Sequence, residues 1–249
     1  MVRGVLILLA LALAAGAAPK KKRKKGPEIV EEKEGKFVHL FLKDDPAAQG
    51  WMIEPDPEWL EEDDDAQRKP GLIVALHGAG GNPKNFLDPR TAQDRWSYYL
   101  AVAGHAKVKT PRGEGYQWDM NGAVYVAHLV RYLIANREID EARVLVWGHS
   151  AGGTMTLETL GHAPELFAGG LTTAAPRTPD SRHLGCRVAV FMGNRDPNWA
   201  TAPSVRNYVE KLAKKRKGGA CAFIEVDGLG HNVPHRDYVS FGLDWILQG

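Results

Sequence analysis

The pentapeptide Gly148-His149-Ser150-Ala151-Gly152 places a serine hydroxyl between an apolar segment and a segment with helical patterning. A strand that turns sharply into a helix needs small residues two positions either side of its centre, because larger side chains would collide with neighbouring elements. Such a turn lifts the serine hydroxyl to the carboxyl edge of a sheet. Gly-x-Ser-x-Gly alone is a weak signal, but its position between a strand and a helix predicts that Ser150 is a nucleophile.

A serine hydroxyl is a poor nucleophile without a neighbouring base. His231 follows the last predicted strand, so its loop is expected at the same sheet edge as Ser150. Asp196 follows the preceding strand, and its carboxylate is expected to hold His231 in one tautomer. His235 is the alternative base and Asp180 the alternative acid.

A second glycine-rich segment, residues 77–81, follows the apolar run 72–76. The tetrahedral intermediate of acyl transfer carries an oxyanion, which needs two N–H donors. We expect Ala151, at the start of a helix, to supply one donor. Ala79 is expected to supply the other, with Gly80 as the alternative.

Aromatic residues fall in loops at the same predicted edge. Trp118 and Trp199, together with His77, are candidates for lining a substrate pocket, and ordinary packing is the alternative for each tryptophan. His149 and His162 have no partners at metal-ligand spacing, so the sequence predicts no metal site.

The elements that must position these residues alternate along the chain. Strands interspersed with helices of 10–15 residues predict a mostly parallel sheet of about eight strands, with helices on both faces. The expected strands cover 37–42, 50–54, 72–76, 106–109, 144–147, 170–174, 187–192 and 222–226. The expected helices cover about 91–103, a segment capped by Asp119 or Asn121, 151–160, a segment through 205–212 and a segment through 238–246.

The N-terminal region differs in composition from the rest of the chain. Residues 1–18 have the layout of a signal peptide, with Arg3 before an apolar run and small residues at its end, and a short membrane anchor is the alternative. A basic and polar linker is expected over 19–36 and a catalytic domain over 37–249. Secretion or periplasmic export follows from this layout, without stable membrane insertion after cleavage. The basic run 20–25 argues against export, because such charge tends to stay on the cytoplasmic side.

Charge separates the leader from the domain. The whole chain carries +2, but from Gly26 onward 25 basic and 30 acidic side chains give −5. A mildly acidic domain argues against nucleic-acid binding.

The two cysteines have equal offsets from predicted catalytic residues. Cys186 lies ten residues before Asp196, and Cys221 lies ten residues before His231. Equal offsets on neighbouring parallel strands predict adjacent thiols and a disulfide, which would fit an oxidising compartment.

The glycine-rich segment 77–81, the pentapeptide around Ser150, then Asp196 and His231, in this order, resemble the α/β-hydrolase superfamily. Within it the chain is similar to the phospholipase/carboxylesterase, feruloyl-esterase and polyhydroxybutyrate-depolymerase groups over about 72–249. The resemblance implies an α/β-hydrolase fold with nucleophile, acid and base at Ser150, Asp196 and His231, and no cofactor. Only about ten residues separate Ala175 from Cys186, which leaves no room for a large lid.

These observations predict a serine hydrolase that cleaves a carboxylic ester, either a small molecule or an acyl group on a polysaccharide. A prolyl-oligopeptidase-like peptidase is the second hypothesis, although the 45 or so residues between Gly26 and Gly71 cannot form the propeller domain of such enzymes. A non-catalytic binding protein on the same scaffold is the third. The sequence fixes neither the acyl and alcohol groups nor the oligomeric state.

Overall fold

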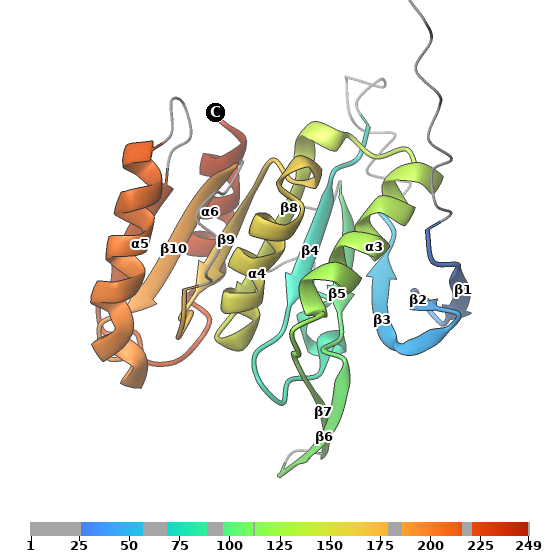
Figure 1. The fold of residues 1–249 in the computed structure, drawn as a ribbon, viewed down its shortest axis with the longest axis horizontal. Helices are drawn as coiled ribbons and strands as arrows, with labels where there is room; N and C mark the ends of the chain where they lie inside the picture. The colour runs from blue at the N-terminus through green and yellow to red at the C-terminus, as the bar shows by residue number, and fades with distance from the viewer. Residues whose placement is uncertain are drawn as a thin grey trace, which may run out of the picture.

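The computed structural model describes residues 26–56, 69–88, 97–111, 113–178, 186–215 and 221–248. In these residues a nine-stranded sheet has the order β1-β2-β3-β5-β4-β8-β9-β10-β11 (Figure 1). Its strands are β1 (Ile29–Glu34), β2 (Phe37–Leu42), β3 (Asp45–Ile53), β4 (Leu72–Leu76), β5 (Tyr98–Val102), β8 (Val144–His149), β9 (Gly169–Thr173), β10 (Arg187–Gly193) and β11 (Cys221–Val226). The pairs from β5 to β11 are parallel, and β1, β2 and β3 add an antiparallel edge.

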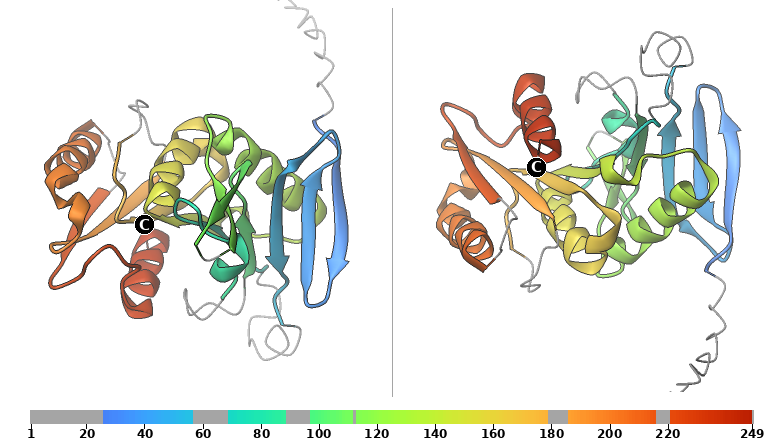
Figure 2. Two further views of the ribbon diagram at one scale, coloured as in Figure 1. Left: turned by 90° about the horizontal axis from the view of Figure 1, so that it is seen from below. Right: turned by 90° about the horizontal axis from the view of Figure 1, so that it is seen from above.

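Helices cover both faces of this sheet. Figure 2 shows α3 (Gly122–Asn136), α4 (Ala151–His162) and α5 (Ala202–Lys215) on one face and α6 (Arg236–Leu247) on the other. Four short 3-10 helices complete the described helical segments: η1 (Pro83–Phe86), η2 (Glu141–Arg143), η3 (Pro164–Leu166) and η4 (Pro197–Thr201). The predicted α/β-hydrolase architecture, with a mostly parallel sheet between helical layers, is confirmed.

The central strands are apolar on both sides because both of their faces are covered. Along β4, Leu72, Val74 and Leu76 pack into the core beneath α3, α4 and α5, and Ile73 and Ala75 pack into the core beneath α6. All five side chains are buried. The alternation of side chains across a strand therefore divides one apolar run between two cores.

One hairpin lies outside the central sheet. β6 (Ala106–Thr110) and β7 (Gly113–Gln117) pair with each other and project beyond the end of the sheet (Figure 1). A strand over 106–109 was predicted as part of the large sheet, and this placement was wrong. The segment alternates small and apolar residues with lysines and has exposed positions, so it lacks the apolar face that a central strand needs.

The helix expected over about 91–103 was also wrong in its described part. Tyr98–Val102 forms β5, parallel to β4 and buried from Tyr99 onward. A short apolar run fits both a buried strand and a buried helix by periodicity, so its pattern did not separate the two. Residues 89–96 lie outside the described part of the chain.

The sheet also begins earlier than expected. Residues 29–34, assigned above to a polar linker, form the edge strand β1, which pairs with β2. Charged side chains are typical of an edge strand, because they hinder pairing with another chain. One of them, Glu31, accepts a hydrogen bond of 2.8 Å from the Arg137 guanidinium at the end of α3.

The leader 1–18 and the basic run 20–25 lie outside the described residues. Among the residues that are described, no helix has the length and apolarity to cross a membrane.

The predicted disulfide is not formed. Cys186 is buried and Cys221 is half-buried, and the structure shows no disulfide between them. The strand register pairs Cys221 with Val188, two residues beyond Cys186, so the equal sequence offsets do not put the two cysteines at the same level.

A substitution at Leu243 tests how much the packing of α6 against the second face of the sheet contributes to stability. Its side chain is 3% exposed, while Phe241 on the same helix is 62% exposed. We expect Leu243→Ala to lower the free energy of unfolding by about 3 kcal/mol, because it leaves a cavity in the core. Phe241→Ala, the matched control, should change it by less than about 0.5 kcal/mol. Urea denaturation of both variants measures the difference, and equal losses would contradict the packing described here.

Candidate active site

The backbone at Ser150 has a conformation that residues other than glycine rarely adopt. Its φ is 56° and its ψ is −120°, at the junction of β8 and α4. The Ser150 N–H donates a 2.8 Å hydrogen bond to the carbonyl oxygen of Thr173, at the end of the neighbouring strand β9. Strained backbone of this kind persists only where surrounding structure holds it, and it is common at active sites.

The glycines around Ser150 are required by close approach. A Cβ at Gly152 would lie 2.1 Å from the carbonyl oxygen of Leu76. A Cβ at Gly148 would lie 2.3 Å from the carbonyl oxygen of Gly152. The helix can therefore start directly above the sheet only because no side chain stands at these two positions, as the pentapeptide pattern predicted.

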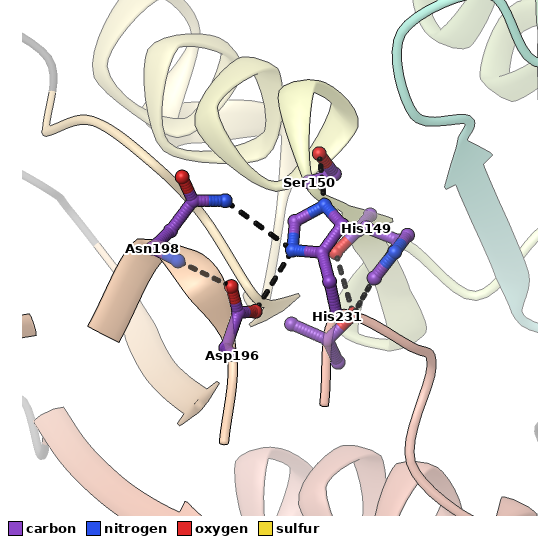
Figure 3. A network of polar contacts seen from close by, with 7 residues as sticks. His149, Ser150, Asp196, Asn198 and His231 are labelled. Atoms are coloured by element: carbon purple, nitrogen blue, oxygen red, sulfur yellow. Dashed lines mark hydrogen bonds and ion pairs between the residues drawn. The ribbon is translucent and has the colours of Figure 1, made fainter. Parts of the chain in front are cut away.

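Three polar side chains that are distant in sequence meet at this turn (Figure 3). The His231 Nε2 lies 2.9 Å from the Ser150 Oγ, and the His231 Nδ1 lies 2.8 Å from the Asp196 Oδ2. The side chain of Asp196 is fully buried and that of His231 is one-third exposed. The imidazole thus bridges an accessible hydroxyl and a carboxylate that is shielded from water.

Parallel strands explain why these side chains meet. Ser150 follows β8, Asp196 follows β10 and His231 follows β11, and the carboxyl ends of all three strands lie at one edge of the sheet. Asp196 is also the N-cap of η4, where its Oδ1 accepts a 2.7 Å hydrogen bond from the Asn198 N–H. Both carboxylate oxygens are therefore engaged, which fixes the plane of the carboxylate. The alternative base, His235, caps α6 and is paired with Asp237, and the alternative acid, Asp180, is outside the described residues.

Sequence reasoning missed Asn198. Its side-chain amide lies 3.3 Å from the His231 Nδ1, and its backbone binds Asp196 (Figure 3). Asn198 therefore contacts both partners of the Asp196–His231 hydrogen bond. The signal available in the sequence was its place two residues after Asp196, where a capping turn brings the chain back over the carboxylate.

Two backbone N–H groups beside Ser150 have no hydrogen-bond partner among the described residues, those of Ala79 and Ala151. Ala151 is the first residue of α4, where the helix dipole favours negative charge. Gly80, the alternative donor, is excluded, because its N–H donates a 2.9 Å hydrogen bond to the carbonyl oxygen of Tyr116.

A pocket of about 450 Å³ contains both Ala79 and Ala151 in its lining. Trp118 and Met155 form apolar parts of its wall, and Arg177 and Glu158 contribute charged groups. Trp118, one of the predicted pocket residues, therefore lines the same pocket as Ala79 and Ala151. Its indole N–H donates a 2.7 Å hydrogen bond to the carbonyl oxygen of His77, which fixes its ring.

The other two predicted pocket residues lie elsewhere. His77 is fully buried and absent from the pocket wall; its Nδ1–H donates to the Gly78 carbonyl oxygen at 2.7 Å, and its Nε2 accepts from the Gly104 N–H at 2.9 Å. It holds the loop together because both ring nitrogens are bonded inside the protein. Trp199 is half-buried on η4 and is not part of this pocket wall.

Two histidines near the site remain neutral well below neutral pH. Burial lowers the pKa of His77 to about 4, against the opposing effect of its hydrogen bond to Gly78. Burial and the nearby His231 together lower the pKa of His149 to about 4, against the opposing effect of Asp196. His149 lies against His231, with ring centroids 5.1 Å apart, and its Nδ1 is 3.0 Å from the Thr173 Oγ1.

Among the described residues no group of three His, Cys, Asp or Glu side chains could hold a metal ion.

The buried His77 predicts a dependence of stability on pH. Because its pKa is lower in the folded state than in the unfolded chain, its contribution is complete above about pH 6.5 and is lost as the pH falls toward 4. When the pH is lowered from about 7 to about 5, the wild type should lose roughly 2 kcal/mol more of its unfolding free energy than His77→Gln does. Urea denaturation at the two pH values measures this loss. The exposed His235→Gln variant should behave as the wild type, and an unaltered pH dependence in His77→Gln would contradict the assignment.

Comparisons with known proteins agree with the fold. A family model described as the prolyl oligopeptidase family matches residues 116–185. Feruloyl esterase B of Neurospora crassa is 32% identical over 143 residues, which cover 47% of this chain and 47% of the relative. Acetylxylan esterase of Coprinopsis cinerea is 28% identical over 127 residues, 43% of this chain and 32% of the relative. The chain thus spans about half or less of the length of these curated relatives.

Solved structures extend the likeness over most of the chain. A carboxylesterase from Mesorhizobium loti superposes with a TM-score of 0.60 at 13% identity, over 89% of this chain and 99% of that one. A thermostable esterase superposes with a TM-score of 0.58 at 20% identity, over 89% of this chain and 62% of that one. The sheet order, the turn at Ser150 and these likenesses lead to one conclusion. The chain has the α/β-hydrolase fold, and its matched part is similar to the esterases named above.

Proposed function

We propose that this protein is a serine hydrolase that cleaves carboxylic esters through an acyl-enzyme intermediate. The observation that carries the proposal is the continuous chain of contacts from the Asp196 carboxylate through His231 to the Ser150 hydroxyl, at 2.8 and 2.9 Å. A nucleophile, a base and an orienting acid in this arrangement are recognised by geometry rather than by sequence position.

In the proposed mechanism His231 Nε2 takes the proton of the Ser150 hydroxyl as its oxygen attacks the ester carbonyl. The Asp196 carboxylate accepts the Nδ1–H bond and stabilises the imidazolium that forms. The imidazolium then protonates the leaving alcohol, and the acyl group remains on Ser150. Water then attacks the carbonyl carbon of the acyl group and gives a proton to His231. The imidazolium returns this proton to the Ser150 oxygen as the bond between that oxygen and the acyl carbon breaks, which releases the carboxylic acid and restores the free hydroxyl.

The N–H groups of Ala79 and Ala151 are the proposed oxyanion donors. Support comes from their position in one pocket wall and from the absence of another partner for either group in the described residues. Each donor of this kind contributes roughly 3 kcal/mol of transition-state stabilisation. Neither donor requires a side chain to move.

The proposed substrate is a small-molecule ester or an ester carried by a polysaccharide. The names of two relatives, feruloyl esterase B and acetylxylan esterase, support this class. Within the pocket the acyl group would pack on the Trp118 ring, which is held by its bond to His77 and stacks on the His77 ring with centroids 4.9 Å apart. A rigid aromatic wall favours a flat acyl group.

A second candidate is a serine peptidase, and the match of residues 116–185 to the prolyl oligopeptidase family favours it. The same catalytic arrangement would serve either bond, so substrate tests decide between them. Export stays a proposal that rests on the leader sequence alone, because the structure shows no disulfide between Cys186 and Cys221 that would support it.

The catalytic assignment predicts the outcome of two matched histidine substitutions. Ser150→Ala and His231→Ala should each reduce kcat for a nitrophenyl ester by about a million-fold. His235→Ala, four residues from the proposed base and exposed, should keep wild-type kcat. A fluorophosphonate probe should label the wild type and His235→Ala but not Ser150→Ala. Labelling of Ser150→Ala equal to the wild type would refute the assignment, and hydrolysis of proline-containing amides in preference to esters would favour the peptidase.

The pocket wall predicts a selective effect of Trp118. Trp118→Ala should raise KM for a feruloyl ester by about fivefold, because aromatic contacts contribute about 1 kcal/mol beyond burial. KM for an acetyl ester, which is too small to reach the ring, should stay within about twofold of the wild type. Trp118→Phe keeps the aromatic wall and should keep the KM for the feruloyl ester. Equal KM increases for both esters in Trp118→Ala would show that Trp118 does not contact the acyl group.

A further inference from the structure

We propose that the β6–β7 hairpin positions the oxyanion loop, residues 77–81, and that Gly115 is a positioning residue because its missing side chain lets the two backbones meet. This inference rests on the proposed hydrolase function, since it assigns a role in oxyanion binding. It concerns a hairpin that lies outside the central sheet and contributes none of the catalytic side chains.

Backbone hydrogen bonds join the hairpin to the loop. The Gly80 N–H donates to the Tyr116 carbonyl oxygen at 2.9 Å, and the Tyr116 N–H donates to the Gly81 carbonyl oxygen at 3.0 Å. β7 therefore pairs with β6 along one edge and with the oxyanion loop along the other. Ala79, the proposed donor, directly precedes the residues that this bridge fixes.

Gly115 is the position where the two segments come closest. A Cβ at Gly115 would lie 2.1 Å from the Gly80 carbonyl oxygen and 2.7 Å from the Gly80 carbonyl carbon. Both atoms belong to the backbone, so a side chain at Gly115 would push the loop itself. Gly80 has a φ of +67°, which makes this part of the loop a tight turn with little freedom to absorb a displacement elsewhere.

The segment after β7 holds the other end of the loop. The indole of Trp118 donates to the His77 carbonyl oxygen at 2.7 Å, and the His77 ring accepts from the Gly104 N–H at 2.9 Å. Ala79 therefore lies between two anchored points, His77 and Gly80, and both anchors lead to residues 104–118. A donor held at both sides needs no reorganisation when the oxyanion forms, which is the condition under which such donors are most effective.

The test is the pair Gly115→Ala and Gly113→Ala, which add the same methyl group two residues apart on β7. A Cβ at Gly113 would meet nothing within 4 Å, although an alanine at this position would be strained by the φ of +110°. We expect Gly115→Ala to lower kcat for a nitrophenyl ester by about 100-fold, because misplacing an oxyanion donor costs about as much as losing it. KM should change by less than about twofold, and Gly113→Ala should keep kcat within about threefold of the wild type.

A trifluoromethyl ketone distinguishes this role from a general loss of structure. The carbonyl carbon of the ketone bonds to the Ser150 oxygen, and the carbonyl oxygen of the ketone becomes an oxyanion. The affinity of Gly115→Ala for the ketone should therefore fall by about the same factor as its kcat. The pH at half-maximal kcat/KM, set by the catalytic histidine, should not move. Unchanged ketone affinity, a loss confined to KM, or an equal loss in Gly113→Ala would overturn the proposal.

Trp118→Phe provides a second route if Gly115→Ala does not fold. It removes the hydrogen bond to His77 and keeps the ring, and it should weaken ketone binding by about five- to tenfold, as expected for one lost hydrogen bond. Wild-type ketone affinity in Trp118→Phe would then count against the proposal. A wild-type protein that hydrolyses no ester and binds no ketone would refute the proposed function, whereas an active wild type with a fully active Gly115→Ala would refute the hairpin's role alone.

Discussion

The strained backbone of Ser150 is the constraint on which the rest of the site depends. A φ of 56° at a serine costs of order 1–3 kcal/mol, and packing and hydrogen bonds around the turn must offset that cost. The bond from the Ser150 N–H to Thr173 holds the turn from the side of β9, and the missing side chain of Gly152 lets the turn lie close to Leu76 on the side of β4. The strain is useful because the hydroxyl then stands clear of the sheet, where His231 can reach it.

The two halves of the site come from opposite sides of β8. The proposed acid and base follow β10 and β11, and their alignment depends on the capping turn of η4, in which Asn198 contacts both Asp196 and His231. The oxyanion loop comes from β4 and is bonded to the hairpin that follows β5. In the proposed mechanism, proton transfer and charge stabilisation therefore depend on separate structural supports, and a change in one can leave the other intact.

The sequence predicted the catalytic edge better than the sheet margins, for a physical reason. Ser150, Asp196 and His231 each follow an apolar strand of a parallel sheet, so strand order alone brings them to one edge. β1 and β5 were missed because a charged edge strand resembles a linker and a short buried strand resembles a buried helix. The hydrogen bond from the Gly80 N–H to Tyr116 and the contact of Asn198 with His231 depend on the conformation of loops, which the periodicity of the sequence does not encode. The disulfide failed because a two-residue shift in register cannot be read from equal spacing.

His149 shows how the site avoids a conflict between neighbouring imidazoles. Its ring lies 5.1 Å from that of His231, which must carry a positive charge during the proposed reaction. Two imidazolium ions this close would repel each other, and the charge on His231 would form less readily. Burial removes the conflict, because it lowers the pKa of His149 to about 4 and keeps that ring neutral over the range in which His231 must accept a proton. The buried Asp196 carboxylate then faces a single cationic ring, and its full attraction acts on the imidazole that touches the nucleophile.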